Sequence, residues 1–219
     1  MSSITVNGLE IPAGALTLEG FREWVALQGE DAPRVHYSRG RVHIEMPQDC
    51  VKHGPVVFAI NDVLRALTRE LDTGRYYEPP TWITDDRSLL STEPDGFFVS
   101  WASLESGRVR INPDRSIELL GRPDMVLEVV SKSSERKDRS ELVSDYAGAG
   151  VPEYWIADGR TEPLVLRILV LSGEGAYREE PADAEGWSFS PTWGRRFRLV
   201  RFLDRAGLTD FRLETERAS

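Results

Sequence analysis

Cysteine is almost missing from this sequence, in which Cys50 is the only one among 219 residues. A single thiol excludes an internal disulfide and any zinc site built from several cysteines, and it agrees with a reducing compartment. Cys50 also follows Asp49, so no basic neighbour activates its thiol. The sequence has no Gly-x-Ser-x-Gly elbow for a serine nucleophile. Nothing in it therefore indicates covalent catalysis by cysteine or serine.

Long hydrophobic runs are missing as well. No apolar stretch reaches the length of a membrane span, and the opening MSSITVNGLE has neither the basic start nor the apolar core of a secretory leader. Both absences argue against membrane insertion and secretion. We therefore expect a cytoplasmic protein that makes no membrane contact.

A surplus of basic residues is the third absence, because the formal net charge is −9. Such a chain is not coated in lysine and arginine for non-specific nucleic-acid binding, which requires clustered positive charge. A local basic groove remains compatible with this charge, although each basic cluster could equally be a solvated surface. The candidate clusters are Arg108 to Arg110, Arg136 to Arg139 and Arg195 to Arg201.

The sequence has no internal repeat, low-complexity segment or long linker, so residues 1–219 are interpreted as one domain. Apolar residues at helical spacing predict a helix that starts near Thr17, a long one in KHGPVVFAINDVLRALTREL and a third over residues 140–149. Alternating segments predict a hairpin in HYSRGRVHIEM and strands in RYYEPPTWIT and EPDGFFVSW, and a turn-rich segment follows from Gly107 to Arg122. A run of strands is predicted in PEYWIAD, LVLRILVL, GAYREE, WSFS and FRLVRF. This order predicts an α/β or α+β fold with a mixed central sheet, flanking helices and additional C-terminal strands.

One carboxylate interrupts the most apolar strand. The segment RPDMVLEVVSK is short and β-branched, which is typical of a strand buried on both faces, yet it contains Glu128. An unpaired buried carboxylate costs several kcal/mol, so Glu128 must be neutral, paired with a basic residue, at a wet edge of the sheet or bound to a cation.

Two strands open with the same dipeptide, Pro-Asp, at Pro94 and at Pro123. Proline suits the first residue of a strand because it has no N–H for the ladder. If the two strands are neighbours, Asp95 and Glu128 converge on one hard cation, and Mg²⁺ prefers such oxygen ligands. Asp124 is the weaker candidate, since it lies nearly one strand length from Glu128, and aspartate after proline is also common in turns.

These motifs resemble the PD-(D/E)XK nuclease superfamily. Nearly the whole chain is similar to the Uma-two-type putative restriction endonucleases, through LEGFREWV, STEPDGFFVSW, PDMVLEVVSKSSERKD, YAGAGVPEYWIAD and GRRFRLV. The resemblance implies a restriction-endonuclease-like fold, a DNA substrate and Mg²⁺ as cofactor, with Mn²⁺ as a substitute. It also implies that Asp95 and Glu128 are metal ligands and that the backbone carbonyl of Val129 is a third.

The resemblance adds two second-tier residues, Glu45 in VHIEM and His53 at the start of the long helix. A lone histidine on an apolar helix face is more often a core or boundary group than a ligand.

The lysine of the superfamily pattern is displaced. Val130 and Leu142 occupy the two usual lysine positions, which leaves Lys132 and Lys137. The most similar branch of the family has a lysine at the position of Lys137, so the resemblance favours Lys137 as the catalytic cation. Its flexible four-carbon stem could bring the ammonium group to the metal site.

Three functions therefore compete. The first is a metal-dependent DNA endonuclease, which would pair as a homodimer by analogy with enzymes that cut both strands. The second is a catalytically inactive nuclease-fold protein that binds a partner, favoured by Val130 and Leu142. The third is a structural or regulatory domain in which Glu128 belongs to a buried ion pair.

Overall fold

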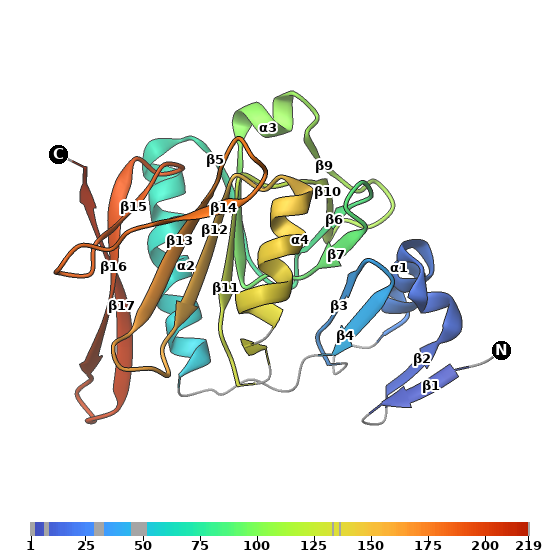
Figure 1. The fold of residues 1–219 in the computed structure, drawn as a ribbon, viewed down its shortest axis with the longest axis horizontal. Helices are drawn as coiled ribbons and strands as arrows, with labels where there is room; N and C mark the ends of the chain where they lie inside the picture. Colours follow the sequence, from blue (N-terminus) through green and yellow to red (C-terminus); the bar gives the residue numbers. More distant parts are fainter. Residues whose placement is uncertain are drawn as a thin grey trace.

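The computed structural model describes residues 3–6, 9–28, 33–44, 52–132, 134–135 and 137–218 (Figure 1). Glu45 and Cys50 lie outside these ranges, and so does the side chain of Lys137. Within the described part of the chain, no helix combines the length and the hydrophobicity that a membrane span needs.

A mixed central sheet carries the buried strand that contains Glu128. Strand β11 runs parallel to β12 and antiparallel to β8. Every residue of β11 is buried, which confirms the prediction of an interior strand. The order across the sheet is β14 (Tyr177–Glu180), β13 (Val165–Leu171), β12 (Glu153–Asp158), β11 (Met125–Val129), β8 (Gly96–Ser100) and β5 (Gly74–Tyr77).

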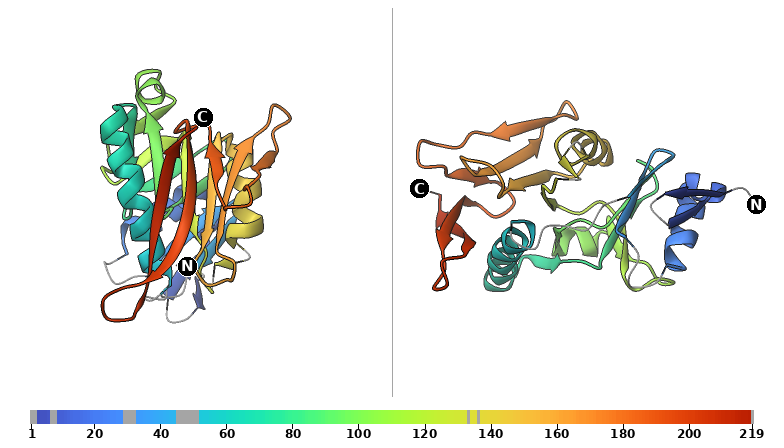
Figure 2. Two further views of the ribbon diagram at one scale, coloured as in Figure 1. Left: turned by 90° about the vertical axis from the view of Figure 1, so that its left-hand side faces the viewer. Right: turned by 90° about the horizontal axis from the view of Figure 1, so that it is seen from below.

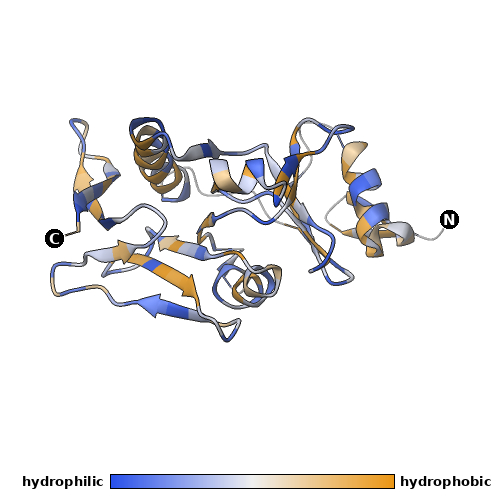
Figure 3. Cartoon of the chain, turned by 90° about the horizontal axis from the view of Figure 1, so that it is seen from above, coloured by the Kyte–Doolittle hydropathy of each residue, from blue (hydrophilic) through white to orange (hydrophobic). Residues whose placement is uncertain are grey.

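Two helices cover opposite faces of this sheet, as the left view of Figure 2 shows. Helix α2 (His53–Leu71) packs Val56, Ile60 and Leu64 against Met125, Leu127 and Val129. Figure 3 shows both hydrophobic and hydrophilic colours on α2, as expected of a helix with one buried face. On the other face, helix α4 (Leu142–Ala149) packs Leu142 and Tyr146 against Val126 and Val130. Alternate side chains of β11 thus point to opposite helices.

Helix α4 ends at Gly150, as predicted, in a left-handed conformation with φ 76°. It is preceded by a π-helical turn, Lys137–Glu141, which the sequence pattern did not predict. That turn leads directly from the end of β11 into α4.

A second sheet shares the α4 face of the central sheet. Its Ile83, Leu90, Val109 and Leu119 join the same apolar cluster as Leu142 of α4. The strand order is β4 (Arg41–Ile44), β3 (Val35–Ser38), β7 (Leu90–Thr92), β6 (Trp82–Asp85), β10 (Glu118–Gly121) and β9 (Val109–Ile111). Strands β9 and β10 lie in the segment from Gly107 to Arg122, for which the sequence predicted turns. The strands were missed because each has only three or four residues between turn residues. The short helix α3 (Trp101–Glu105) connects β8 to β9.

The N-terminal elements cover the outer side of the second sheet. Helix α1 (Leu18–Ala26) packs Phe21 and Trp24 against Tyr37 and Trp82. The Oγ1 of Thr17 accepts a hydrogen bond from Gly20 N at 3.1 Å, which confirms the predicted helix cap. The remaining elements here are β1 (Ser3–Val6), β2 (Leu9–Pro12) and the 3₁₀ turn Ala13–Leu16.

Three C-terminal strands form a separate antiparallel sheet next to α2 (Figure 1). They are β15 (Ser188–Ser190), β16 (Arg195–Leu203) and β17 (Thr209–Arg217). The first two were predicted, whereas β17 was not, although Phe211 and Leu213 alternate with charged residues there. The buried carboxylate of Glu153 accepts hydrogen bonds from Ser190 Oγ and Thr192 N and so ties this sheet to β12.

Candidate active site

Asp95 and Glu128 belong to adjacent strands at the same end of the central sheet. In the antiparallel ladder Leu127 faces Gly96, so the next step brings Asp95 opposite Glu128. The Oδ2 of Asp95 accepts a hydrogen bond from the backbone N–H of Val129 at 2.8 Å. Both acidic residues are only 3% exposed. The two acids are therefore buried cross-strand neighbours, and Asp95 is bonded to the residue that follows Glu128.

Two cationic or polar side chains contact the carboxylate of Asp95. Arg34 donates from Nη1 to Oδ1 at 2.9 Å, and His53 Nε2 lies 3.3 Å from Oδ2. Burial would raise the pKa of Asp95, but the contact with His53, the charge of Arg34 and the amide of Val129 together lower it well below its usual value. Asp95 is therefore held as a carboxylate.

Helix α2 and strand β5 fix the loop that carries Asp95. Asn61 Nδ2 donates to the backbone carbonyl of Asp95 at 3.0 Å, and Tyr76 Oη donates to Asn61 Oδ1 at 2.8 Å. A Cβ at Gly96 would lie 2.3 Å from Tyr76 Oη and 2.7 Å from Asn61 Oδ1. The glycine that follows Asp95 is therefore required for this close packing.

The side chain of Glu128 reaches toward α4. Tyr146 Oη donates a hydrogen bond to Glu128 Oε1 at 2.8 Å. Burial and the nearby charge of Glu128 raise the pKa of Tyr146 well above its usual value. Tyr146 thus stays a protonated donor, and its bond satisfies one oxygen of a buried acid.

The two usual lysine positions lie in the core. Val130 is 1% exposed and Leu142 is fully buried, both in the cluster beneath α4. Lys137 begins the π-helical turn that follows β11, whereas Lys132 is exposed earlier in the connection. Within the described residues, the turn is anchored to the core by Tyr154 Oη, which donates to the backbone carbonyl of Asp138 at 2.9 Å.

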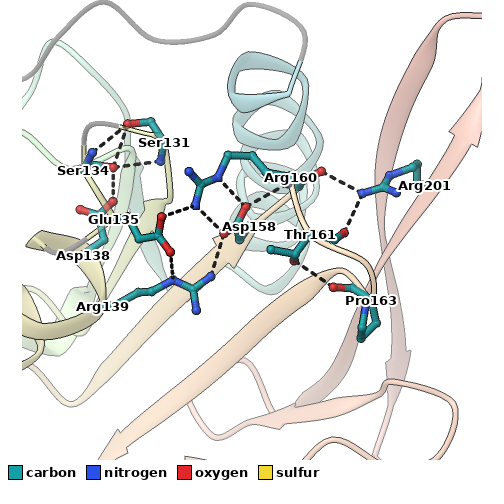
Figure 4. Close-up of polar contacts among 11 residues, drawn as sticks. Ser131, Ser134, Glu135, Asp138, Arg139, Asp158, Arg160, Thr161, Pro163 and Arg201 are labelled. Atoms are coloured by element: carbon teal, nitrogen blue, oxygen red, sulfur yellow. Dashed lines mark hydrogen bonds and ion pairs between the residues drawn. The ribbon is translucent and has the colours of Figure 1, made fainter.

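An ion-pair network anchors the same turn to the end of strand β12 (Figure 4). Asp158, the last residue of β12, accepts from Arg139 Nη2 at 2.7 Å and from Arg160 Nη2 at 2.9 Å. Arg160 Nη2 also lies 3.3 Å from Glu135 Oε2. Burial would raise the pKa of Asp158, but its bonds with the two arginines lower it. Because β11 and β12 are parallel, this network lies at the same end of the sheet as Glu128.

Asp124 lies at the opposite end of β11. Its Oδ2 accepts from Ser100 N at 2.7 Å and from Ser103 Oγ at 2.6 Å, and its other oxygen pairs with Arg108. The second Pro-Asp motif therefore caps the start of α3 and does not join Asp95.

The donor set at the site fits a divalent cation such as Mg²⁺. Asp95 and Glu128 would supply hard carboxylate oxygens, and Val129 would supply a backbone carbonyl oxygen; one or two carboxylates with waters are a common Mg²⁺ environment. Among the described residues, no group of three or more histidine, cysteine, aspartate or glutamate side chains is placed to hold a metal ion. Arg34 is a competing internal cation, since it already neutralises Asp95.

Two contacts of this site have no signal in the sequence. Arg34 lies 61 residues before Asp95 and follows no periodic pattern. Tyr146 has helical spacing that is typical of a core aromatic, and the hydrogen bond of its hydroxyl group to Glu128 depends on how α4 crosses the sheet. Only the tertiary structure brings either residue to an acid.

Comparison with known proteins identifies a family and a solved structure with a similar fold. The model of a family named Uma2 and described as "Putative restriction endonuclease" matches residues 18–197. The crystal structure of a putative nuclease belonging to DUF820 from Anabaena variabilis has a TM-score of 0.59 and 17% sequence identity, over 81% of this chain and 90% of that chain. At 17% identity this similarity is evidence for the fold alone, and it confirms the predicted architecture. No curated protein matches the chain.

Proposed function

Since the chain belongs to the Uma2 family of putative restriction endonucleases, we propose that it is a metal-dependent endonuclease that hydrolyses phosphodiester bonds in DNA. The observation that carries this proposal is the pair of buried carboxylates, Asp95 and Glu128, which face each other across adjacent strands at one end of the central sheet. Burying two carboxylates lowers the stability of the folded protein, so such a pair is expected where its charge has a function.

In this proposal each residue has one task. Asp95 and Glu128, with the backbone carbonyl of Val129, hold the ion. A bound divalent ion supplies Lewis acidity, which polarises a phosphate and lowers the pKa of water. His53 supports Asp95 from the start of α2, 3.3 Å from its Oδ2. Lys137 stabilises the negative charge that develops on the phosphate, and Glu45 remains a second-tier candidate.

The organisation of the chain follows from the same proposal. The central sheet and both of its covering helices form continuous apolar clusters, which supports one domain over residues 1–219. Cleavage of both strands of a duplex requires two sites in opposed orientation, so we propose that the active form is a homodimer. Light scattering of the purified protein tests this directly: a monomeric mass at working concentration contradicts it.

A second function is favoured by two observations. Val130 and Leu142 are buried where lysine is usual, and Arg34 neutralises Asp95. Both are expected of a nuclease-fold protein that has lost catalysis and acts as a binding or regulatory protein.

Plasmid cleavage separates the two functions. The parent protein is incubated with supercoiled and linear DNA at low salt, with Mg²⁺ and with Mn²⁺, so that weak ionic contacts are not screened. The nuclease proposal predicts cleavage that falls by at least about 100-fold in Glu128→Gln. The matched control is Asp62→Asn, whose carboxylate is 70% exposed on α2. A parent that cleaves nothing under any of these conditions favours the binding protein.

A further inference from the structure

A groove runs between helix α4 and the second sheet, away from the two carboxylates. It comprises a cavity of about 500 Å³ near the C-terminal end of α4 and a cavity of about 330 Å³ near its start. The two cavities adjoin. Arg39 lines the smaller cavity and Gly148 lines the larger one, and a Cβ atom added to Gly148 would lie only 2.7 Å from Arg39 Nη2.

Arginine is the dominant charged residue of this groove. The larger cavity is lined by Arg87, Arg108, Arg110 and Arg122 and by two aspartates, Asp85 and Asp86. The smaller cavity is lined by Arg39, Arg41 and His43 and by two acids, Glu141 and Asp145. Six arginines against four acids give a locally positive surface on a chain whose net charge is −9.

Four of these arginines have their charge available. Within the described residues, the exposed side chains of Arg41, Arg87, Arg110 and Arg122 form no hydrogen bond or ion pair. By contrast, Arg108 pairs with Asp124, and Arg39 Nε lies 3.5 Å from Asp145 Oδ1. Exposed guanidinium groups are well suited to phosphate, which they contact through two parallel hydrogen bonds.

Glycine keeps one wall of the groove open. Gly150 has φ 76°, and a Cβ there would lie 2.3 Å from Arg122 Nη1. Gly148 is packed against Arg39 in a similar way. The guanidinium groups of Arg39 and Arg122 therefore lie close to the backbone at the end of α4. A side chain at either position would force the neighbouring guanidinium group to move.

One end of the groove reaches the π-helical turn that follows β11. Its smaller cavity is lined by Ser140 and Glu141 of the π-helical turn that begins at Lys137, and His43 Nδ1 lies 3.3 Å from Glu141 Oε2. Helix α4 has eight residues, a length of about 12 Å. At about 3.4 Å per nucleotide, the groove spans roughly three to four nucleotides of one strand.

We infer that this groove binds the phosphodiester backbone of one nucleic-acid strand and leads it toward Lys137 and Glu128. Arg41, Arg87, Arg110 and Arg122 supply the phosphate contacts, and the backbone of α4 forms the wall. That the ligand is DNA rests on the proposed function. That the groove binds a phosphodiester backbone rests on the two cavities and on the charged residues that line them.

Binding without cleavage tests this inference. Fluorescence anisotropy with labelled duplex DNA, single-stranded DNA and duplex RNA is measured in EDTA, as a function of salt. The triple variant Arg87→Gln/Arg110→Gln/Arg122→Gln is compared with Arg69→Gln/Arg205→Gln/Arg217→Gln. The control arginines are exposed and lie outside the groove, and both triples lower the net charge by three.

The groove variant is expected to bind DNA at least about 10-fold more weakly, with a salt dependence reduced by two to three units in the log–log slope, while the control changes little. Equal weakening of both triples, unchanged binding by the groove variant, stronger binding to RNA than to DNA, or no binding by the parent overturns the inference. Circular dichroism confirms that each variant is folded.

Failure of the groove and failure of the proposed function give different results. A parent that cleaves DNA, with a groove triple that binds and cleaves equally well, refutes the groove alone. A parent that never cleaves but binds DNA through the three arginines refutes the nuclease and leaves the groove intact.

Discussion

Arg34 and Asp95 form an ion pair at the end of the central sheet, with Nη1 2.9 Å from Oδ1. Arg34 Nη2 also donates to the backbone carbonyl of Glu93 at 2.6 Å, so the guanidinium group is fixed beside the carboxylate. A positive charge therefore lies against one of the two carboxylates that the proposal assigns to the metal ion. This contact gives the site its own counterion.

Removing that charge is expected to strengthen metal binding. In Arg34→Gln the carboxylate of Asp95 loses its competing cation, so Mg²⁺ affinity should rise by roughly 3- to 10-fold. Isothermal titration calorimetry measures this, with Arg65→Gln on α2 as the control for lost surface charge. Unchanged or weaker Mg²⁺ binding in Arg34→Gln would mean that the arginine does not compete with the ion.

Lys137 is expected to act on the transition state and not on the ion. Lys137→Ala should lower cleavage by about 100-fold and leave Mg²⁺ affinity nearly unchanged, because loss of one electrostatic donor typically has this effect. Lys132→Ala, in the same connection, is the matched control and should cleave like the parent. Equal rates for Lys137→Ala and the parent would show that the lysine assignment is wrong.

Tyr146 is expected to position Glu128. Tyr146→Phe removes the hydroxyl group that donates to Glu128 Oε1 and should lower both Mg²⁺ affinity and cleavage several-fold in a protein that still folds. Tyr177→Phe removes a comparable bond, from Tyr177 Oη to Val151 O, away from the site. If both variants lose stability alike and neither changes metal binding, Tyr146 is only a structural residue.

Glu118 makes stability depend on pH. Burial would raise its pKa, but hydrogen bonds from Arg22, Thr84 and Asn112 lower it. Because the folded pKa is depressed, this stabilisation is present above the unfolded pKa of about 4.3 and is lost as pH falls through the folded value.

Glu118→Gln tests this dependence. It should lower the free energy of unfolding by roughly 1–3 kcal/mol at pH 7, and the difference from the parent should shrink below about pH 4. Urea denaturation at several pH values measures it, with the exposed Glu174→Gln as control. A difference that stays constant with pH would contradict the assignment.

The sequence predicts the periodic elements and the pairing of the two acids. Helix α2 and strand β11 have long or strongly apolar patterns, and the Pro-Asp motif places Asp95 at a strand end. Strands β9 and β10 are too short for a periodic signal, and their pairing depends on contacts such as that of Glu118 with Arg22 across 96 residues.

The surroundings of the acids follow from tertiary contacts. The pairing of Arg34 with Asp95 and that of Arg139 with Asp158 join separate elements, and neither leaves a spacing in the sequence that could be recognised. The basic cluster at Arg108 to Arg110 was visible, but its place in the groove became evident only with α4 beside the second sheet.

The central claim is that Asp95 and Glu128 together bind one divalent ion. The most direct measurement is calorimetric titration of Mg²⁺ and Mn²⁺ into the parent protein, Asp95→Asn and Glu128→Ala, each shown to be folded. We expect saturable binding with one site per chain in the parent and its loss in both variants. A parent that binds no ion, or a Glu128→Ala variant that binds as tightly as the parent, would contradict the claim.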